Sequence, residues 1–466
     1  MLFTSPMFAF VFLPISLFLY YLFGKRCKRA FVFGISVAFH LLLHAYHPVG
    51  VLFLLGTVFY CWVFGKALTR YRRGLFVFAV CVTPYLFLIL FRNLLLPWES
   101  GFWYPVGMTV VAMRCTSYLL EAVRGEIKRR NRLFDLAFYL LFFPTMLVGP
   151  FVKYSDFLRL CEEDRMELSP RNLSDGVRLF ASGFVKRIAL GATLIEAVEM
   201  TLKQFLASPN LMMGVCLLAF VYFGVYFSVT GYADMGCGIS YMLGIRLRNI
   251  PTTPFRSALP DEYSHNLFPS LHSFLDDYVV RPMTRMLGGR FPHLIHAVAY
   301  GGCLLLIVRP SLYILLLAIP SMGLEYACSR FDLEHRLEGR IGPRVLYSTL
   351  TVTAVAVGWV FITMGDVSTV WEYMTHITYE NPEYYTDLLL VALSGRRFLV
   401  LIAMGILLLL PSMGMERYLR RKWPRIYEGY EAVYTIVVLI LFLISILFFL
   451  PKYGIYNNFP FRFVYV

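Results

Sequence analysis

Long hydrophobic runs separated by short polar connections follow one another along most of the chain. The runs at 2–23, 49–68 and 75–96 each reach the length of about 20 residues that a helix needs to cross a bilayer. The other runs are shorter or interrupted, and lie at 31–44, 102–123, 134–147, 176–205, 211–229, 298–319, 346–362, 398–410 and 433–450. This pattern predicts an all-α polytopic membrane protein with roughly ten or eleven transmembrane or part-crossing helices.

Several of these runs contain residues that interrupt a simple membrane helix. The run 102–123 includes Pro105, Gly107 and Arg114, which predicts a broken or re-entrant helix, and such breaks survive only inside protein or along a cavity. The run 176–205 is amphipathic and we expect it to be half-inserted. We also expect Gly231 to break the helix that begins in 211–229, and the following Asp234 to line the interior.

One stretch, residues 254–290, is polar and charged inside a sequence otherwise suited to lipid. It contains His265 and His272 and four acidic residues, which are Asp261, Glu262, Asp276 and Asp277. Such groups are expensive at membrane depth unless they face a partner, a cavity or a substrate, so this re-entrant or amphipathic region is the first place to look for function. The alternative is a loop and amphipathic helix at the headgroup surface, with its charges in water.

Composition agrees with the hydrophobic pattern. The 466 residues are 58% hydrophobic and only 15% charged, which excludes an ordinary soluble protein, so we predict a single integral-membrane domain over residues 1–466. The formal charge of +14 gathers in short basic runs beside apolar segments, as in cytoplasmic loops. We therefore expect membrane lipid as a partner and no nucleic acid.

Cysteine and histidine spacings give no metal centre. The nine cysteines are scattered singly, which supports neither a disulfide framework nor a zinc site. His40, His44 and His47 fall on one helical face that would suit a metal, but no carboxylate or cysteine accompanies them, and packing is the better interpretation. We predict no metal and no bound cofactor.

The order of sequence blocks is similar to that of one family. The blocks are FTSPMFAFVFLPISLFLYYLF, YPVGMTVVAMRCTSYLLEAVRGEI, DLAFYLLFFPTMLVGPFVKYSDF, SGFVKRIAL, VYFGVYFSVTGYADMGCGISYMLGI, GWVFIT and FPFRFVYV. In order and interval they resemble the membrane-bound O-acyltransferase (MBOAT) family, in particular its bacterial branch that contains the alginate O-acetyltransferase membrane protein and the D-alanyl transfer protein of lipoteichoic acid. The resemblance covers nearly the whole chain.

This resemblance implies a bundle of helices around a central tunnel in the bacterial inner membrane. A thioester donor, acetyl-CoA or an acyl carrier, would arrive from the cytoplasmic side, and a hydroxyl of a polysaccharide or envelope glycan from the other. A buried histidine would act as general base, since imidazole can take a proton near neutral pH. The resemblance also implies a separate extracytoplasmic acyltransferase as partner and a role in alginate or other exopolysaccharide biosynthesis.

The chain departs from the family pattern at both histidine positions. The family block E-F-W-R-R-W-H-x-S-L-x-x-W-L-x-D-Y falls on EYSHNLFPSLHSFLDDY, so Glu262, Asp277 and Tyr278 match and the histidine is replaced by Phe268. The block W-H-G-A, followed by H-G, falls on VRPS and then on Met322 and Gly323. Arg309 therefore occupies the position at which the family has its catalytic histidine. Phenylalanine has no polar atom and arginine keeps its proton, so neither can be the base.

Three explanations stay open for this departure. The chain could have lost catalysis and kept the fold, as a channel or assembly scaffold, so whether it is an enzyme stays open. Catalysis could have moved to His265 or His272, which flank Phe268 at helical spacing although Pro269 disturbs the regularity. The alignment could also be shifted, with His293 or His296 in the role.

The remaining candidates are substrate-binding or tunnel residues. Glu262, Asp234, Asp277, Tyr278 and Met322 are assigned to the tunnel by their positions in the family blocks. Arg309 could bind a phosphate or carboxylate, or simply pair with a carboxylate such as Asp234 or Asp277. Asp276 and Asp277 are adjacent, so they should point to different helix faces.

The first hypothesis is thus an O-acyltransferase of the polysaccharide or cell-envelope O-acetylation type. A catalytically degenerate homologue, in effect a pseudoenzyme, is the main alternative. A lipid or ion transporter is a third hypothesis, which the order of the family blocks argues against.

Overall fold

The computed structural model describes residues 3–23, 27–45, 49–71, 74–94, 107–127, 133–146, 151–162, 165–207, 211–247, 254–289, 292, 295–296, 298–299, 341–364, 396–409, 419 and 421–453. Every regular element within these residues is a helix, which confirms the predicted all-α class. The described chain forms two compact units, one mainly from Met1–Phe180 and Tyr232–Asn249, the other mainly from Ala181–Gly231 and residues after Ile250. The single domain over 1–466 stays a prediction.

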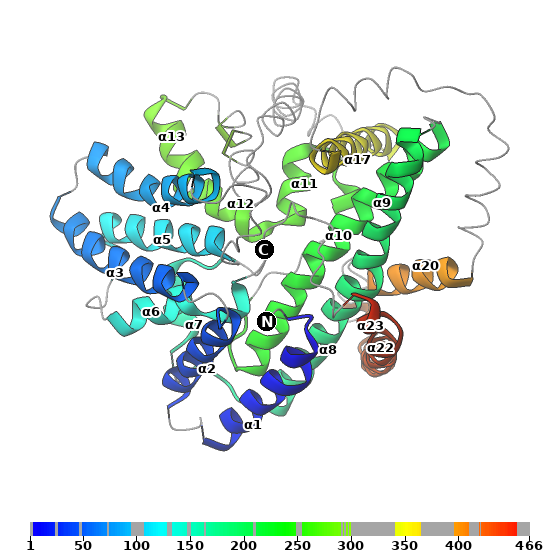
Figure 1. Cartoon of the computed structure of the whole chain (residues 1–466), viewed down its shortest axis with the longest axis horizontal. Coiled ribbons are helices and arrows are strands. Elements are labelled where there is room, and N and C mark those ends of the chain that lie inside the picture. The colour runs from blue at the N-terminus through cyan, green and yellow to red at the C-terminus, as the bar shows by residue number, and fades with distance from the viewer. Residues whose placement is uncertain are drawn as a thin grey trace. The chain divides into compact units, whose positions relative to one another are not determined.

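The first unit contains the N-terminal helices. They are η1 (Met7–Phe12), α1 (Leu13–Phe23), α2 (Lys28–Leu43), α3 (Val49–Arg70), α4 (Gly74–Leu94), α5 (Met108–Arg124), α6 (Leu133–Leu141), η2 (Phe143–Thr145), α7 (Tyr154–Leu160) and the first part of α8 (Pro170–Val185). Helices α3, α4 and α5 lie side by side (Figure 1). The rings of Phe3, Phe8, Phe39 and Phe143 pack together between η1, α2 and η2 and form an aromatic core.

The second unit contains the polar stretch and the C-terminal helices. Its elements are η3 (Lys186–Gly191), α9 (Ala192–Ala207), most of α10 (Leu211–Met242), η4 (Pro254–Arg256), α11 (Pro260–Leu267), α12 (Pro269–Leu275), η5 (Asp276–Val280), α13 (Arg281–Met286), α17 (Ile341–Met364), α20 (Arg396–Leu409), α22 (Pro424–Ile444), η6 (Ser445–Phe449) and α23 (Leu450–Tyr453). Tyr222, Tyr226, Tyr263 and Leu267 belong to its apolar core, together with Met404.

Three helices of the described chain are long and apolar enough to cross a membrane. They are Gly50–Arg70, Leu211–Met242 and Gly429–Phe449, and shorter apolar helices occur at Met7–Phe23, Phe76–Leu86 and Val400–Leu409. Large apolar side chains on the surfaces of these helices are exposed, for example Leu52 (67% exposed) and Phe448 (72% exposed). Such surfaces suit contact with lipid tails, so the chain is a polytopic membrane protein. The predicted span 298–319 lies almost wholly outside the described residues.

A buried arginine joins α5 to the end of α6. The guanidinium of Arg114, which is 5% exposed, donates to the carbonyl oxygens of Tyr139, Leu140 and Phe142 at 3.1–3.2 Å and to the hydroxyl of Thr145. The last carbonyl groups of a helix have no partner within the helix, and lipid offers none. Arg114 therefore satisfies the C-terminus of α6 at the point where Pro144 prevents further helix. The predicted interruption of the run 102–123 agrees with the structure at Gly107. Helix α5 begins directly after this residue, whose φ of 81° is not helical.

The start of α7 is satisfied from the same helix. The buried carboxylate of Glu121 accepts the backbone N–H of Ser155 at 2.9 Å, and the hydroxyl of Ser117 accepts that of Tyr154 at 3.2 Å. These N–H groups belong to the first turn of α7, where no backbone partner exists. One helix, α5, thus supplies the polar groups that end α6 and begin α7.

Glycines allow the backbones of α8 and α10 to touch. In the first unit a methyl group on Gly238 would lie 2.7 Å from the carbonyl oxygen of Gly176. In the second unit a methyl group on Gly231 would lie 2.8 Å from the carbonyl oxygen of Gly183. In both helices the two glycines are seven residues apart, so they repeat on one face. Small residues of this kind are the usual means of close helix packing in membranes.

The expectation that Gly231 breaks the helix is wrong. Helix α10 runs without interruption from Leu211 to Met242, and Asp234 lies inside it with only 4% of its surface exposed. Gly231 serves close packing and not a change of backbone direction, because the neighbouring helix occupies the space where a side chain would stand. Lys186 and Arg187, expected on a half-inserted helix, are buried in η3.

We predict that Arg114→Met destabilises the protein by about 3 kcal/mol or more, because it leaves several buried acceptors without a donor. Unfolding by SDS in mixed detergent micelles, followed by circular dichroism, measures the change. Arg159→Met is the control, since the ion pair of Arg159 with Asp156 is exposed and should contribute less than about 1 kcal/mol. Equal losses in the two variants would contradict the role of Arg114.

We also predict opposite effects for two helical Gly→Ala changes. Gly231→Ala should destabilise by about 1–3 kcal/mol because the added methyl group meets backbone atoms of the neighbouring helix. Gly34→Ala should be neutral or stabilise by about 0.5–1 kcal/mol, since nothing lies within 4 Å of the added group and alanine favours helix. The same unfolding measurement compares them, and a stable Gly231→Ala protein would show that α8 and α10 can separate at little cost.

Candidate functional site

The polar stretch folds into a series of short helices because prolines interrupt it. Helix α11 begins at Pro260, and α12 begins at Pro269, directly after Phe268. Proline lacks a backbone N–H and its ring clashes with the preceding turn, so it kinks or ends a helix and is best tolerated in the first turn. The backbone of Phe268 is accordingly non-helical, with φ −133° and ψ 68°. The chain bends here and brings α11 against α12.

Helix α17 anchors the beginning of this region. The Oγ of Ser348 donates to the carbonyl oxygen of Phe255, and the Oγ1 of Thr351 donates to that of Ala258, both at 2.8 Å. Glu262 accepts the backbone N–H of Ala258 at 2.9 Å and a guanidinium N–H of Arg344 at 3.2 Å. The carboxylate of Glu262 therefore fixes the turn before α11. Its predicted role in substrate binding or in the tunnel stays a prediction.

Three histidine rings meet where α11 and α12 come together. The ring centroids of His265 and His272 lie 4.9 Å apart, and those of His272 and His296 lie 4.4 Å apart. His265 is exposed, His272 is half-buried and His296 is 5% exposed. The sequence predicts His265 and His272 on one helical face; the helix in fact breaks between them, and the bend at Phe268 brings their rings into contact.

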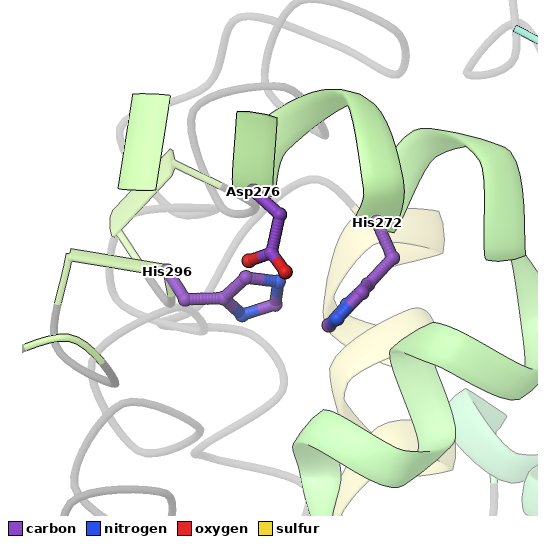
Figure 2. Close-up of side chains that lie close together, drawn as sticks. All are labelled: His272, Asp276 and His296. Atoms are coloured by element: carbon purple, nitrogen blue, oxygen red, sulfur yellow. The ribbon is translucent and has the colours of Figure 1, made fainter. Parts of the chain in front are cut away.

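A carboxylate completes this group. Asp276 follows His272 by four residues, and its backbone N–H donates to the carbonyl oxygen of His272, so the two side chains leave the same face. Figure 2 shows the carboxylate of Asp276 close to the ring of His296, with His272 beside them. One possible ligand atom from each of these three residues lies within 4.8 Å of the others. We call His265, His272, Asp276 and His296 the histidine cluster.

Asp277 and Tyr278 point elsewhere. The carboxylate of Asp277 accepts a hydrogen bond from Arg281 at 2.7 Å, which confirms that Asp276 and Asp277 occupy different helix faces. Tyr278 is buried with its ring 4.9 Å from that of Phe274. Phe268 is half-buried and packs against the apolar core of the second unit. Tunnel roles for Asp277 and Tyr278 stay predictions.

The structure describes only some of the other predicted site residues. Asp234 lies in the part of α10 that belongs to the first unit, and its tunnel role stays a prediction. Arg309, Met322 and His293 lie outside the described residues. The N-terminal histidines agree with packing: the Nε2–H of His40 donates to the carbonyl oxygen of Leu141 at 2.9 Å, and the His40 and His44 rings are parallel with centroids 6.2 Å apart. His47 is also outside the described chain.

The sequence pattern places Asp276 among the acidic residues of the polar stretch and on a different helix face from Asp277, but does not predict its contact with His296. The four-residue spacing of His272 and Asp276 was a usable signal, because residues at that spacing share a helix face. The contact with His296, which lies twenty residues after Asp276 in sequence, has no local signature.

The histidine cluster can do two kinds of chemistry. A neutral imidazole can take the proton of a hydroxyl group, and a nearby carboxylate orients the ring and stabilises its protonated form. The same donor set, two imidazoles and one carboxylate, is also a common ligand set for a divalent metal ion.

No family model matches the chain. The chain is similar to the protein named "Probable alginate O-acetylase AlgI" of Pseudomonas aeruginosa, with 27% identity over 401 residues that cover 80% of this chain and 74% of the relative. It is also similar to the peptidoglycan O-acetyltransferase of Helicobacter pylori, with 23% identity over 32% of this chain and 28% of the relative. The teichoic acid D-alanyltransferase of Bacillus subtilis is 24% identical over 37% of this chain and 44% of the relative.

The coverage of these relatives is uneven. The chain spans 56% to 60% of the length of four further AlgI proteins, and less of the peptidoglycan and teichoic acid enzymes. By their names, these relatives are O-acetylases, an O-acetyltransferase and a D-alanyltransferase. The chain is therefore a homologue of membrane-bound O-acyltransferases, which confirms the resemblance seen in its sequence blocks.

Proposed function

We propose that this protein transfers an acyl group, most simply acetyl, from a thioester donor to a hydroxyl of an extracellular polysaccharide or cell-envelope glycan. The observation that carries the proposal is the histidine cluster, in which His265, His272 and Asp276 come from the block where the resemblance implies a histidine and this chain has Phe268. The names of the homologues, which are O-acetylating or D-alanylating proteins of polysaccharide and envelope polymers, support the substrate class.

The chemistry requires a hydroxyl oxygen to attack the carbonyl carbon of the thioester. The oxygen must lose its proton as it attacks, and the thiolate leaves with a proton at the end. The histidine cluster provides the groups for the first step, with His272 at its centre because its ring contacts both His265 and His296. His296 is 5% exposed, so its side of the cluster is shielded from the water that would hydrolyse a thioester.

The setting of the reaction is part of the proposal. The donor is acetyl-CoA or an acyl carrier on the cytoplasmic side of a bacterial inner membrane, and a separate extracytoplasmic acyltransferase receives or passes on the acyl group. Arg309, at the position of the family base, would bind a phosphate or carboxylate of a substrate, because its charge persists at all relevant pH values. Glu262, through its contacts with Ala258 and Arg344, would hold α11 in place and not touch substrate.

The test is restoration of glycan O-acetylation in a bacterium that lacks its own membrane acyltransferase but keeps the acceptor and the partner protein. We expect the unmodified chain to restore acetylation, and His272→Ala to lower it by about 100-fold or more, as is usual when an acid–base group is lost. His265→Ala measures whether the exposed ring takes part. Ser273→Ala, an exposed neighbour of His272, is the matched control and should keep full activity.

Three results would contradict the proposal. Full activity of His272→Ala would remove the histidine cluster from the reaction. No activity of the unmodified chain, although it reaches the membrane in normal amount, would favour a non-catalytic channel or scaffold. Activity gained only by Arg309→His would mean that the substrate path survives but its base has been lost.

A further inference from the structure

The geometry points to a divalent metal site of the zinc type formed by His272, Asp276 and His296. The inference rests on the proposed function for its chemical role but not for metal binding itself. Within the described residues, these three side chains offer two imidazole nitrogens and one carboxylate oxygen that all lie within 4.8 Å of one another. The cysteine spacings and the N-terminal histidines predict no metal, whereas the fold brings a different set of possible ligands together.

The ligand types select the metal class. Two histidines with one carboxylate form the protein ligands of catalytic zinc in several hydrolases, and the fourth position then holds water or substrate. A set of oxygen ligands alone would favour magnesium or calcium, whereas imidazole favours zinc and its transition-metal neighbours. Ligand bonds of about 2.0–2.2 Å place neighbouring ligand atoms about 3.4 Å apart. Metal binding would thus require the three ligand atoms to move closer together than the 4.8 Å within which they now lie.

The backbone supports such a site. His272 and Asp276 are one helical turn apart, joined by the hydrogen bond from the Asp276 N–H to the His272 carbonyl, so both ligands come from one rigid segment. His296 approaches from a second segment and is 5% exposed, while His272 and Asp276 are half-buried (Figure 2). Metal sites commonly take two ligands from one helix at this spacing and a third from elsewhere. The ion would thereby link two segments that are distant in sequence and already in contact through the His272 and His296 rings.

Neighbouring charges leave the carboxylate of Asp276 available to a cation. Arg281, the nearest basic residue along the helix, pairs with Asp277 on the other face. His265 touches the ring of His272 but lies outside the ligand set and is exposed to solvent. With three protein ligands and an open position, a bound zinc ion would acidify a coordinated hydroxyl or polarise a carbonyl group. With zinc bound, the imidazole of His272 would be a ligand and not the proton acceptor, and the metal ion would activate the acceptor hydroxyl in its place.

The test is the metal content of the full-length protein, purified in mild detergent without chelators and analysed by mass spectrometry of the elements. We expect about one zinc ion per chain in the unmodified protein, because the three side chains form a single site. His272→Ala, Asp276→Asn and His296→Ala should each lose it. Asp277→Asn and His265→Ala are the matched controls and should keep the zinc ion. Asp277 is adjacent to Asp276 in sequence and the His265 ring contacts that of His272, but neither residue is a proposed ligand. Replacement of zinc by cobalt(II) should give visible absorption bands that the three ligand variants lack.

Each outcome decides between the two proposals. Retention of metal by Asp276→Asn, or absence of zinc and cobalt binding in the unmodified protein, would overturn the metal site. Because a ligand variant could fail to fold, its elution as a monodisperse peak and its helical circular dichroism are measured alongside, and Asp276→Glu, which keeps the carboxylate, should retain metal. Zinc without glycan O-acetylation would keep the site and reject the proposed function, whereas O-acetylation by a zinc-free protein would do the reverse.

Discussion

The contact of glycine backbones between α8 and α10 is the constraint on which much of this structure depends. A helix pair in lipid gains little from burial of apolar surface, since lipid tails are as apolar as the side chains. Close approach of the two backbones replaces that gain with many van der Waals contacts. The pairs Gly176 with Gly238 and Gly183 with Gly231 occur once in each compact unit, and each unit therefore contains a segment of this tight packing.

Polar groups within the helical units serve mainly to complete other helices. Arg114, Ser117 and Glu121 all belong to α5, yet their partners are the end of α6 and the start of α7. Glu262 performs the same task for the turn before α11, with help from Thr351 of α17. In a lipid environment a helix that ends inside the protein needs such donors and acceptors, because no water replaces them. Arg114, Glu121 and Glu262 thus all make structural contacts, and the histidine cluster differs because its members contact one another.

Much of the helical content could be predicted from hydrophobic run length alone, because helices in lipid must be long and apolar. The predicted runs 49–68 and 346–362 fall within α3 (Val49–Arg70) and α17 (Ile341–Met364). The predicted helix break at Gly231 is wrong because the sequence does not say whether a glycine changes the backbone direction or allows a neighbouring helix to pack closely. The site was predictable only where it is local: the spacing of His272 and Asp276 is visible in the sequence, whereas the approach of His296 depends on tertiary folding.

The break at Phe268 has a mechanical consequence. Helix α11 carries His265 and is tied through its preceding turn to α17 by Ser348 and Thr351, while α12 carries His272. The separation of the two imidazole rings depends on the non-helical backbone angles of Phe268, which lies between the two helices. A tilt of α17 would therefore act on the turn before α11 and change the distance between these rings.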